Sequence, residues 1–287
     1  MKKAVFFLGC VALAACTRKE PVRPDLHYVV GAPWQADGRW FYPREEFSWQ
    51  GTGVAVRQTG RDGELTTDGE VRDSATMTGS HQSLQLPAVV TVINLENGRE
   101  VTIRVNDRGP AMAGRMIGLS SRAADLLGMG KGPAQVRVVE DEAASRQLAE
   151  TLPGGPTLQI SSAPLERVTQ TDLGGAQGTS VVGAENSAVA AGTPHGPTVL
   201  PDLPVTVRQG QPGPGMFWVE TMDFTSRYAA MVQAARQGGV LRPAMTGSGQ
   251  GTLWAVRYGP FVTIQEADAA LKRALASGLT GSHLVVE

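Results

Sequence analysis

Residues 89–110 read VVTVINLENGREVTIRVNDRGP and carry a strong β-hairpin signal. Apolar and polar residues alternate over 89–95, and 99–105 has the pattern of a returning strand. Asn97-Gly98 between them is the dipeptide that best fits a type I′ turn. The hairpin places Asp107 just past a strand end, where a rigid sheet can hold a carboxylate toward a cleft.

Short strand patterns and Gly-rich turns continue on both sides of this hairpin, over residues 51–140. One brief helix is predicted at 121–127, with Ser120 or Ser121 as its cap and Gly128 at its end. A strand at 135–139 completes the pattern. A stretch of about ninety residues of this kind predicts a small, mainly β barrel.

Residues 213–287 show a different pattern, in which strands and helices alternate. The predicted order is strand, helix, strand, strand, helix, strand, with strands at 217–224, 253–258 and 283–286 and a first helix at 226–237. Thr263-Ile264-Gln265-Glu266 is a capping box that begins the second helix, and Gly278 ends it. This βαββαβ order predicts a ferredoxin-like α+β domain with both helices on one face of its sheet.

The two remaining long segments differ in aromatic content. Residues 141–212 contain no Phe, Trp or Tyr and are rich in Gly, Pro, Ala, Ser and Thr, which predicts a disordered linker. Such a linker lets two domains reach separate places on one large target. Residues 16–50 carry seven aromatic side chains, so we expect that segment to pack on a folded domain: Tyr28, Trp34, Trp40, Phe41, Tyr42, Phe47 and Trp49.

The first residues indicate the destination of the chain. Lys2 and Lys3 precede a short apolar run that ends in Leu13-Ala14-Ala15-Cys16, which is typical of a lipoprotein signal peptide over 1–15. We therefore expect Cys16 to be lipidated, which leaves no cysteine pair for a disulfide. Thr17 after the cysteine resembles lipoproteins sent to the outer membrane, so the expected location is the periplasmic face of that membrane.

Charge and composition exclude several classes of protein. The chain has 26 basic and 27 acidic residues, so it lacks the basic surplus of a nucleic-acid-binding protein. Four scattered histidines without a cysteine pair do not suggest a zinc site. We expect no metal and no cofactor.

Several short motifs follow one another in a fixed order and spacing: Tyr28-Val29-Val30-Gly31, Asp68-Gly69-Glu70, Ser80-His81, Val105 to Pro110 and Ala123 to Gly128. Together they resemble the rare lipoprotein A family, whose members combine a lipoprotein signal with a double-psi β-barrel. Many members add a C-terminal sporulation-related repeat domain. Phe217-Trp218-Val219 and Arg257-Tyr258-Gly259-Pro260-Phe261 resemble that repeat.

The resemblance implies a lytic transglycosylase that cleaves the β-1,4 bond between N-acetylmuramic acid and N-acetylglucosamine and leaves a 1,6-anhydro end. The implied substrate is peptidoglycan glycan stripped of stem peptides. The family's functional positions correspond to Glu70, His81 and Asp107. The repeat domain is expected to bind the same glycan and to concentrate the protein at the septum. Proteins of the division machinery are its expected partners there.

The chemistry suits these residue types. When the sugar's own 6-hydroxyl attacks the glycosidic carbon, one carboxyl group that acts first as an acid and then as a base is sufficient. We predict that Asp107 is this group, that Glu70 tunes it, and that His81 orients it or contacts sugar. Arg108 is a candidate glycan-binding residue. The catalytic interpretation requires that the three side chains converge on one open groove; if Asp107 points away from Glu70 and His81, that interpretation fails.

Two departures from the family pattern support an alternative, a catalytically inactive, expansin-like lipoprotein that binds the wall. Gly118 stands where the family normally has an aspartate, and no aromatic residue occurs over 51–140. In the C-terminal domain, four residues are candidates for a glycan-binding sheet face: Trp218, Glu220, Trp254 and Arg257. Core or solvated strand positions are an equally good interpretation of these four, because strand parity sends alternate residues to opposite faces.

Overall fold

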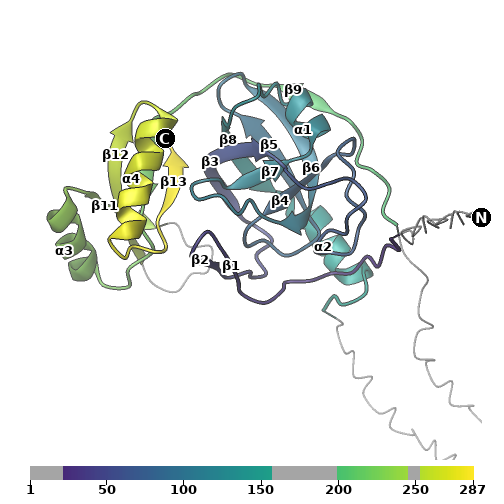
Figure 1. The fold of residues 1–287 in the computed structure, drawn as a ribbon, viewed down its shortest axis with the longest axis horizontal. Helices are drawn as coiled ribbons and strands as arrows, with labels where there is room; N and C mark the ends of the chain where they lie inside the picture. Colours follow the sequence, from purple (N-terminus) through teal and green to yellow (C-terminus); the bar gives the residue numbers. More distant parts are fainter. Residues whose placement is uncertain (1–21, 157–198, 245–252) are drawn as a thin grey trace, which may run out of the picture.

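The computed structural model describes residues 22–156, 199–244 and 253–287. It contains a β-barrel, with an N-terminal segment packed against it, and a smaller C-terminal domain (Figure 1). The predicted signal peptide and Cys16 lie outside the described residues. Within the described ranges, no helix combines the length and the apolar character needed to cross a membrane.

Six strands close the barrel: β3 (Gln50–Arg57), β4 (Thr78–His81), β5 (Ala88–Asn94), β6 (Arg99–Arg108), β7 (Ile117–Leu119) and β8 (Ala134–Glu140). Their hydrogen-bonded order is β4-β7-β3-β8-β5-β6, and β4 pairs with β6 to complete the ring. The β3–β7 and β4–β6 pairs are parallel, whereas the other pairs are antiparallel. The closed barrel agrees with the predicted double-psi β-barrel.

The hairpin of β5 and β6 confirms the prediction with one change. Gly98 has the positive φ of +76° that its turn requires. However, β6 continues beyond Val105 to Arg108, because Ser80 and His81 of β4 pair with Asp107 and Arg108. Asp107 therefore lies within a paired strand rather than past its end, and the pairing fixes its backbone.

Alternate strand residues fill the barrel. Val101, Ile103 and Val105 of β6 are at most 1% exposed and share one apolar cluster with residues of β3, β5, β7 and β8. Helix α1 (Ser121–Leu126) also packs on this cluster. As predicted, Ser120 caps the helix, accepting a hydrogen bond from the Ala123 N–H at 3.1 Å, and Gly128 follows it at φ +71°.

The N-terminal segment packs on the barrel, as its aromatic content predicts. Strands β1 (Trp34–Ala36) and β2 (Arg39–Phe41) form a small hairpin in which the rings of Trp34 and Phe41 stack with centroids 4.6 Å apart. Tyr28 and Phe47 are buried in a second apolar cluster with residues of helix α2 (Glu142–Thr151).

Helix α2 and residues 199–216 correct the expected linker at both of its ends. The Ser145 hydroxyl of α2 accepts a hydrogen bond from the Val89 N–H at 3.0 Å, so this helix belongs to the barrel. Residues 199–216, which we call the strap, return to the barrel, and strand β9 (Val207–Gln209) within them pairs with β6. Composition could not reveal the pairing of β9, because it is made through backbone hydrogen bonds. The rest of the expected linker, 157–198, lies outside the described residues.

The C-terminal domain has the predicted order of elements: β10 (Phe217–Glu220), α3 (Arg227–Gln237), β11 (Val240–Ala244), β12 (Leu253–Phe261), α4 (Ile264–Ala276) and β13 (His283–Val286). The sheet order is β11-β12-β10-β13, with antiparallel neighbours. Both helices pack on one face, α4 over Val219 and Leu284 and α3 over Val256. The predicted capping box of Thr263 and Glu266 is present.

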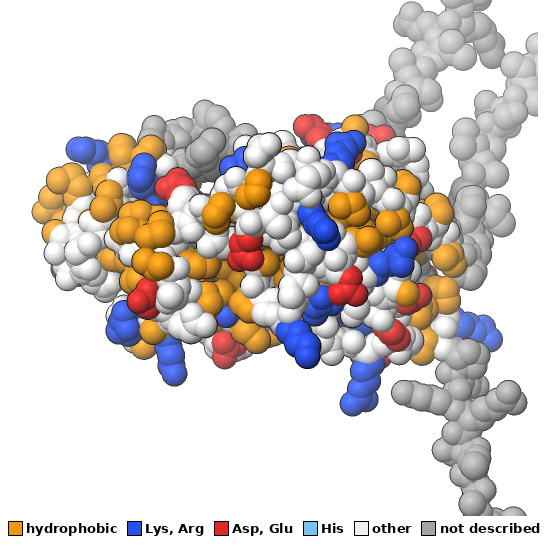
Figure 2. All heavy atoms as spheres, turned by 90° about the horizontal axis from the view of Figure 1, so that it is seen from above, with side chains coloured by type: hydrophobic (Ala, Val, Ile, Leu, Met, Phe, Trp, Pro, Cys, Tyr) orange, Lys and Arg blue, Asp and Glu red, His pale blue; other side chains and the backbone are white. Residues whose placement is uncertain are grey.

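The C-terminal domain is packed directly against strand β3. The Thr52 hydroxyl donates to the Val286 carbonyl oxygen at 2.7 Å and accepts from the Val286 N–H at 3.2 Å. Arg115 donates two hydrogen bonds of 2.7 Å to the Asp268 carboxylate. Val54 of β3 is fully buried in the same cluster as α4. Figure 2 shows the two parts as one continuous surface with charges of both signs interspersed over it.

Candidate active site

Asp107 is held by three donors from the loop that precedes β4. Its Oδ1 accepts hydrogen bonds from the Thr67 N–H at 3.0 Å and from the Thr67 hydroxyl at 2.6 Å. Its Oδ2 is ion-paired with Arg72. The Asp107 side chain keeps 13% of its surface exposed, so the carboxylate is fixed in direction yet accessible at the end of the barrel.

Glu70 comes from the same loop but reaches different partners. Its carboxylate accepts from the Arg104 guanidinium at 2.7 Å and from the Asn106 amide at 2.6 Å. Asn106 and Asp107 are consecutive residues at an irregularity of β6, where its pairing with β4 shifts register. Glu70 is thus bound to Arg104 and Asn106, whereas Asp107 is bound to Thr67 and Arg72.

The loop owes its shape to Asp68 and Gly69. Asp68 Oδ1 accepts from the Thr66 hydroxyl at 2.6 Å and from the Glu70 N–H at 3.2 Å, while Oδ2 is buried without a partner among the described residues. Burial, reinforced by the Glu70 charge, raises the pKa of Asp68 to about 7. Gly69 has φ +85°, and a Cβ there would lie 1.9 Å from the Asp25 carbonyl oxygen. Only glycine fits at this position.

His81 is buried and neutral. Its Nδ1 faces the N–H groups of Ser83 and Leu84 at 3.3 and 3.2 Å, so Nδ1 is the acceptor and Nε2 carries the proton. Burial, and next the positive charge of Arg108, lowers the pKa of His81 to about 3. The Trp49 ring packs edge-on against the imidazole with centroids 4.7 Å apart.

Arg108 is used inside the protein. Its guanidinium donates to the carbonyl oxygens of Leu84 at 2.5 Å and Val30 at 2.6 Å and reaches that of His81 at 3.5 Å. It therefore ties the N-terminal segment to the end of β4. Burial lowers the pKa of Arg108 to about 10, against the opposing effect of Asp107.

No hydrogen bond joins Glu70, His81 and Asp107 to one another in the described structure. Each side chain is held by its own set of partners. Thr67 and Arg72, which bind Asp107, were not among the residues that the sequence singled out. Their position on either side of Asp68-Gly69-Glu70 was the available signal.

A row of register partners extends from Asp107 across the barrel. Ser80 of β4 pairs with Asp107 on one side and with Gly118 of β7 on the other. An added Cβ at Gly118 would lie 2.4 Å from Ser80 Oγ and 3.1 Å from Gln58 Cγ. The position where a side chain was expected is therefore closely packed, with Ser80 and Gln58 filling the space.

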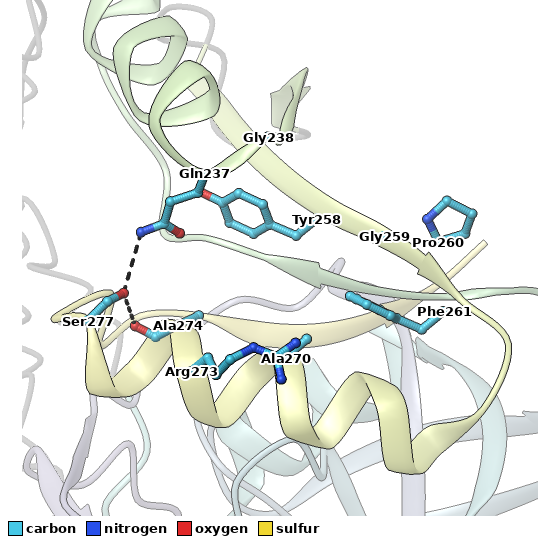
Figure 3. A pocket seen from close by; sticks show the side chains of 10 residues that line it. All are labelled: Gln237, Gly238, Tyr258, Gly259, Pro260, Phe261, Ala270, Arg273, Ala274 and Ser277. Atoms are coloured by element: carbon cyan, nitrogen blue, oxygen red, sulfur yellow. Dashed lines mark hydrogen bonds between the residues drawn. The ribbon is translucent and has the colours of Figure 1, made fainter.

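A polar cleft of about 220 Å³ opens beside Arg72, the ion-pair partner of Asp107. Its lining is Gln58, Gly60, Asp62, Arg72, Ser74, Ser120 and Ser121. A second cavity, of about 520 Å³, lies in the C-terminal domain between α3, β12 and α4 (Figure 3). Gln237 donates to the Ser277 hydroxyl at 3.5 Å across its edge. All of its lining residues belong to the C-terminal domain, whereas the smaller cleft is lined by Arg72, the ion-pair partner of Asp107.

The four sheet-face candidates of the C-terminal domain separate into two groups. Trp218 and Glu220 alternate with the helix-facing Phe217 and Val219, so they lie on the face that the helices leave open. Arg257 is ion-paired with Glu220 on that face. Trp254 instead packs toward α3, and the Arg227 guanidinium lies 5.4 Å from its ring centroid.

Comparison with known proteins places this geometry in a family. A family model described as lytic transglycolase matches residues 52–138. The endolytic peptidoglycan transglycosylase RlpA of Pseudomonas aeruginosa PAO1 is 31% identical over 255 residues, which cover 83% of this chain and 71% of that protein. RlpA of Vibrio cholerae is 46% identical over 77 residues, 26% of this chain and 29% of that protein. RlpA of Helicobacter pylori J99 is 35% identical over 117 residues, which cover 37% of this chain and 35% of that protein. On the length and identity of the first match, the chain belongs to the rare lipoprotein A (RlpA) family.

Proposed function

We propose that this protein is a lytic transglycosylase that cleaves the β-1,4 bond between N-acetylmuramic acid and N-acetylglucosamine in peptidoglycan, with Asp107 as the general acid/base. The observation that carries the proposal is the Asp107 carboxylate, fixed by Thr67 and Arg72 yet accessible at the end of β6. The family model over the barrel and the names of the relatives support the reaction class.

The reaction needs one carboxyl group that acts twice. The 6-hydroxyl oxygen of the muramic acid attacks C1 of the same sugar, so that the C1–O6 bond forms and the bond from C1 to the leaving oxygen breaks. The hydroxyl proton passes through Asp107 to the leaving oxygen, and no water is consumed. All three contacts to Asp107 are donors, so the carboxylate is presented as an acceptor, as proton removal requires.

Glu70 and His81 act in this proposal as positioning residues. Glu70 anchors the loop to Arg104 and Asn106, and the same loop delivers Thr67 and Arg72 to Asp107. His81 fixes the turn after β4 through its Nδ1, so that Ser80 and its strand stay paired with Asp107.

The test uses protein without the segment through Cys16, incubated with amidase-treated peptidoglycan, with products identified by mass spectrometry beside an Asp107→Asn control. Anhydro-muramyl fragments from the parent alone are the expected result. No fragments from the parent, with intact binding to the same glycan, would contradict the catalytic proposal.

The second candidate function is wall binding without catalysis. The observation that favours it is that Asp107 and Glu70 are each ion-paired with an arginine and do not meet. Gly118 and the aromatic-free barrel agree with it. In that case Asp107→Asn protein and the parent bind glycan equally, and neither yields fragments.

We further propose that the C-terminal domain binds glycan lacking stem peptides through its open face and holds the protein at the septum. Trp218, Glu220 and Arg257 lie together on that face and support this proposal. Pelleting with amidase-treated and untreated peptidoglycan tests it, and Trp218→Ala is expected to weaken pelleting on the treated glycan.

The sequence Leu13-Ala14-Ala15-Cys16 supports the proposal of a lipid anchor on the periplasmic face of the outer membrane. Labelling of cells with palmitate tests this anchor. The expected result is label on the parent and none on the Cys16→Ser variant, with the labelled protein in the outer-membrane fraction.

A further inference from the structure

Two large aromatic side chains are exposed on the N-terminal hairpin. Trp40 of β2 is 56% exposed, and Tyr42, two residues further along the chain, is 65% exposed. Arg39 and Phe41, which alternate with them, are buried. Residues two apart on an extended chain point to the same side, and the alternating burial agrees with this rule. The rings of Trp40 and Tyr42 therefore share one exposed surface, which we call the platform.

The hairpin that carries the platform is held firmly. Three residue pairs join β1 to β2 in regular antiparallel register. Behind the platform, the Phe41 ring stacks on Trp34, and the Arg39 guanidinium lies 5.1 Å from the Phe41 ring centroid. The two exposed rings thus stand on a packed layer of side chains. A surface that is ordered before its ligand arrives loses less conformational entropy on binding.

The hairpin is attached to the end of the barrel at which Asp107 lies. The Trp34 indole N–H donates to the Gln82 carbonyl oxygen at 3.0 Å, and the Arg44 N–H donates to the Ser83 carbonyl oxygen at 2.9 Å. Gln82 and Ser83 directly follow β4, which runs parallel to β6. Parallel strands finish at the same end of a barrel, so the hairpin is anchored where β6 presents Asp107.

The other side of the hairpin contacts the C-terminal domain. The Arg39 guanidinium, which is buried, donates to the Ser282 carbonyl oxygen at 3.2 Å. Ser282 immediately precedes β13, whose first residue, His283, pairs with Glu220 on the open face of the sheet. Figure 1 shows β1 and β2 between the barrel and the C-terminal domain. The hairpin therefore connects the two parts of the protein for which glycan contacts are proposed.

The chemistry of the platform suits a sugar ring. One face of a pyranose carries mainly C–H groups, which pack on the negative face of an aromatic ring. Residues 51–140 of the barrel contain no Phe, Trp or Tyr, so an aromatic contact to glycan at this end must come from another segment. The Trp49 ring is partly buried and packs against His81, which leaves Trp40 and Tyr42 as the exposed rings of this segment. A glycan strand is also longer than the bond that is cleaved, so it continues over neighbouring surface.

The charges near the platform favour a glycan over a membrane surface, where Trp and Tyr are also common. Residues 37–46 carry three acidic side chains and two basic ones, and one of the basic ones, Arg39, is buried. Surfaces that bind anionic lipids carry a surplus of basic residues instead. Stacking on an uncharged sugar ring needs no such surplus.

We propose that Trp40 and Tyr42 form a subsite on which sugar rings of the glycan strand stack, outside the bond that is cleaved. This inference rests on the proposed function, because it states how the substrate of that site is held. The platform contacts the strand but not the reacting atoms. It therefore determines affinity for glycan and leaves the chemical step unchanged.

The experiment measures dissociation constants of the full chain carrying Asp107→Asn and Cys16→Ser, so that glycan is not consumed and no lipid is attached. The probe is peptide-free glycan from amidase-treated peptidoglycan, and vesicles of phosphatidylethanolamine and phosphatidylglycerol test the membrane alternative. Trp40→Leu and Tyr42→Leu keep apolar bulk but remove the ring, whereas Trp40→Phe keeps a ring. Tyr228→Leu is the matched control, because Tyr228 lies on α3 and is 76% exposed.

The expected result is that Trp40→Leu and Tyr42→Leu each weaken glycan binding about twofold to tenfold, as the loss of one aromatic contact predicts. Trp40→Phe should keep most of the affinity, Tyr228→Leu should behave as the parent, and vesicle binding should not change. Parental affinity in both Leu variants would overturn the inference, as would equal losses in Trp40→Phe and Trp40→Leu. A loss of vesicle binding alone would assign the platform to the membrane and overturn it too.

The outcome is separable from that of the proposed function. In protein with native Asp107, Trp40→Leu should raise KM for peptide-free glycan by a similar factor and leave kcat unchanged. If the parent releases no anhydro fragments but the ring variants still weaken binding, catalysis fails and the platform stands. If the parent cleaves glycan and the variant with both Trp40→Leu and Tyr42→Leu has parental affinity and KM, the function stands and the platform fails. A fall in kcat at unchanged KM would also overturn the inference, because the hairpin would then act on the chemical step.

Discussion

Arg72 is ion-paired with Oδ2 of Asp107, and the two side chains are only 15% and 13% exposed. Thr67 binds the other oxygen of the same carboxylate. Because Thr67 and Arg72 flank the Asp68-Gly69-Glu70 turn, the position of the carboxylate depends on the shape of that one loop.

Thr67→Val removes the hydroxyl that donates to Asp107 at 2.6 Å while keeping the size of the side chain. We expect kcat to fall by roughly tenfold to 100-fold, with KM little changed, because a misplaced catalytic group loses orientation rather than substrate. Steady-state kinetics on peptide-free glycan measure this. Thr91→Val on β5 makes the same chemical change away from the site and should leave kcat intact. A rise in KM without a fall in kcat contradicts the prediction.

Asp68 makes stability depend on pH. Its pKa is about 7 in the folded protein, against an ordinary value of about 3.9 when unfolded. Between these two pKa values the folded protein binds more protons than the unfolded protein. The free energy of unfolding therefore decreases as the pH rises from about 4 to 7. Asp68→Asn should raise Tm over the parent at pH 8 and much less at pH 4.

Thermal melts at both pH values test this, and each 1 kcal/mol corresponds to roughly 2–4 °C in a chain of this size. Burial raises the pKa of Glu140 to about 7 as well, so Asp68→Asn should remove only part of the slope and Glu140→Gln another part. An equal Tm change at pH 4 and pH 8 would show that Asp68 does not titrate in this range.

His81 should not titrate between pH 5 and pH 8, because burial holds its pKa at about 3. NMR chemical shifts of the imidazole protons measure this, with the His81 signals assigned by their loss in His81→Asn. The chain has four histidines, so the variant identifies which of the imidazole signals belong to His81. A His81 signal that moves with a midpoint near 6.5 would contradict a buried neutral ring.

Gly118→Ala should destabilise the protein by about 1–3 kcal/mol, as overpacking typically does. The reason is the 2.4 Å approach of the new Cβ to Ser80 Oγ. Gly130→Ala is the matched control, since a Cβ there meets nothing within 4 Å. Adding Ser80→Ala to Gly118→Ala should restore much of the lost Tm. If the double variant is no more stable than the single, the contact with Ser80 is not the cause.

Arg115→Asp should separate the C-terminal domain from the barrel, because it breaks a two-bond pair with Asp268 and places two carboxylates together. Small-angle X-ray scattering should show a larger radius of gyration than the parent. Combining Arg115→Asp with Asp268→Arg should bring the radius back. An unchanged radius in the single variant would mean that Thr52 and the apolar contacts suffice.

Local signals predicted most elements of the fold. Asn97-Gly98, the Ser120 cap and the Thr263 capping box act through neighbouring residues, and the structure confirms all three. The strap could not be predicted, because the three residues of β9 are exposed and join β6 through their backbone. Composition carries no record of such pairing.

The site was only partly predictable for the same reason. Residue types and order pointed to Glu70, His81 and Asp107, but the partner of each depends on how the loop folds over β6. The alternation of side chains along a strand also did not tell which face of the C-terminal sheet the helices cover. In the structure, Trp254 lies on the helix-covered face, under α3. Contacts between residues distant in sequence decided what composition and periodicity left open.

Because the strap returns to the barrel, the segment 157–198 connects two parts of the barrel rather than the barrel and the C-terminal domain. The chain leaves the barrel after α2 and is again bound to it at Pro201 and Asp202, by Arg104 and Met77 at 3.0 and 2.9 Å. The intervening residues thus start and finish on the same body, as an insertion does. Shortening or lengthening them should leave the spacing between catalytic barrel and C-terminal domain unchanged, so this stretch of the gene is free to vary in length without altering how far the enzyme reaches.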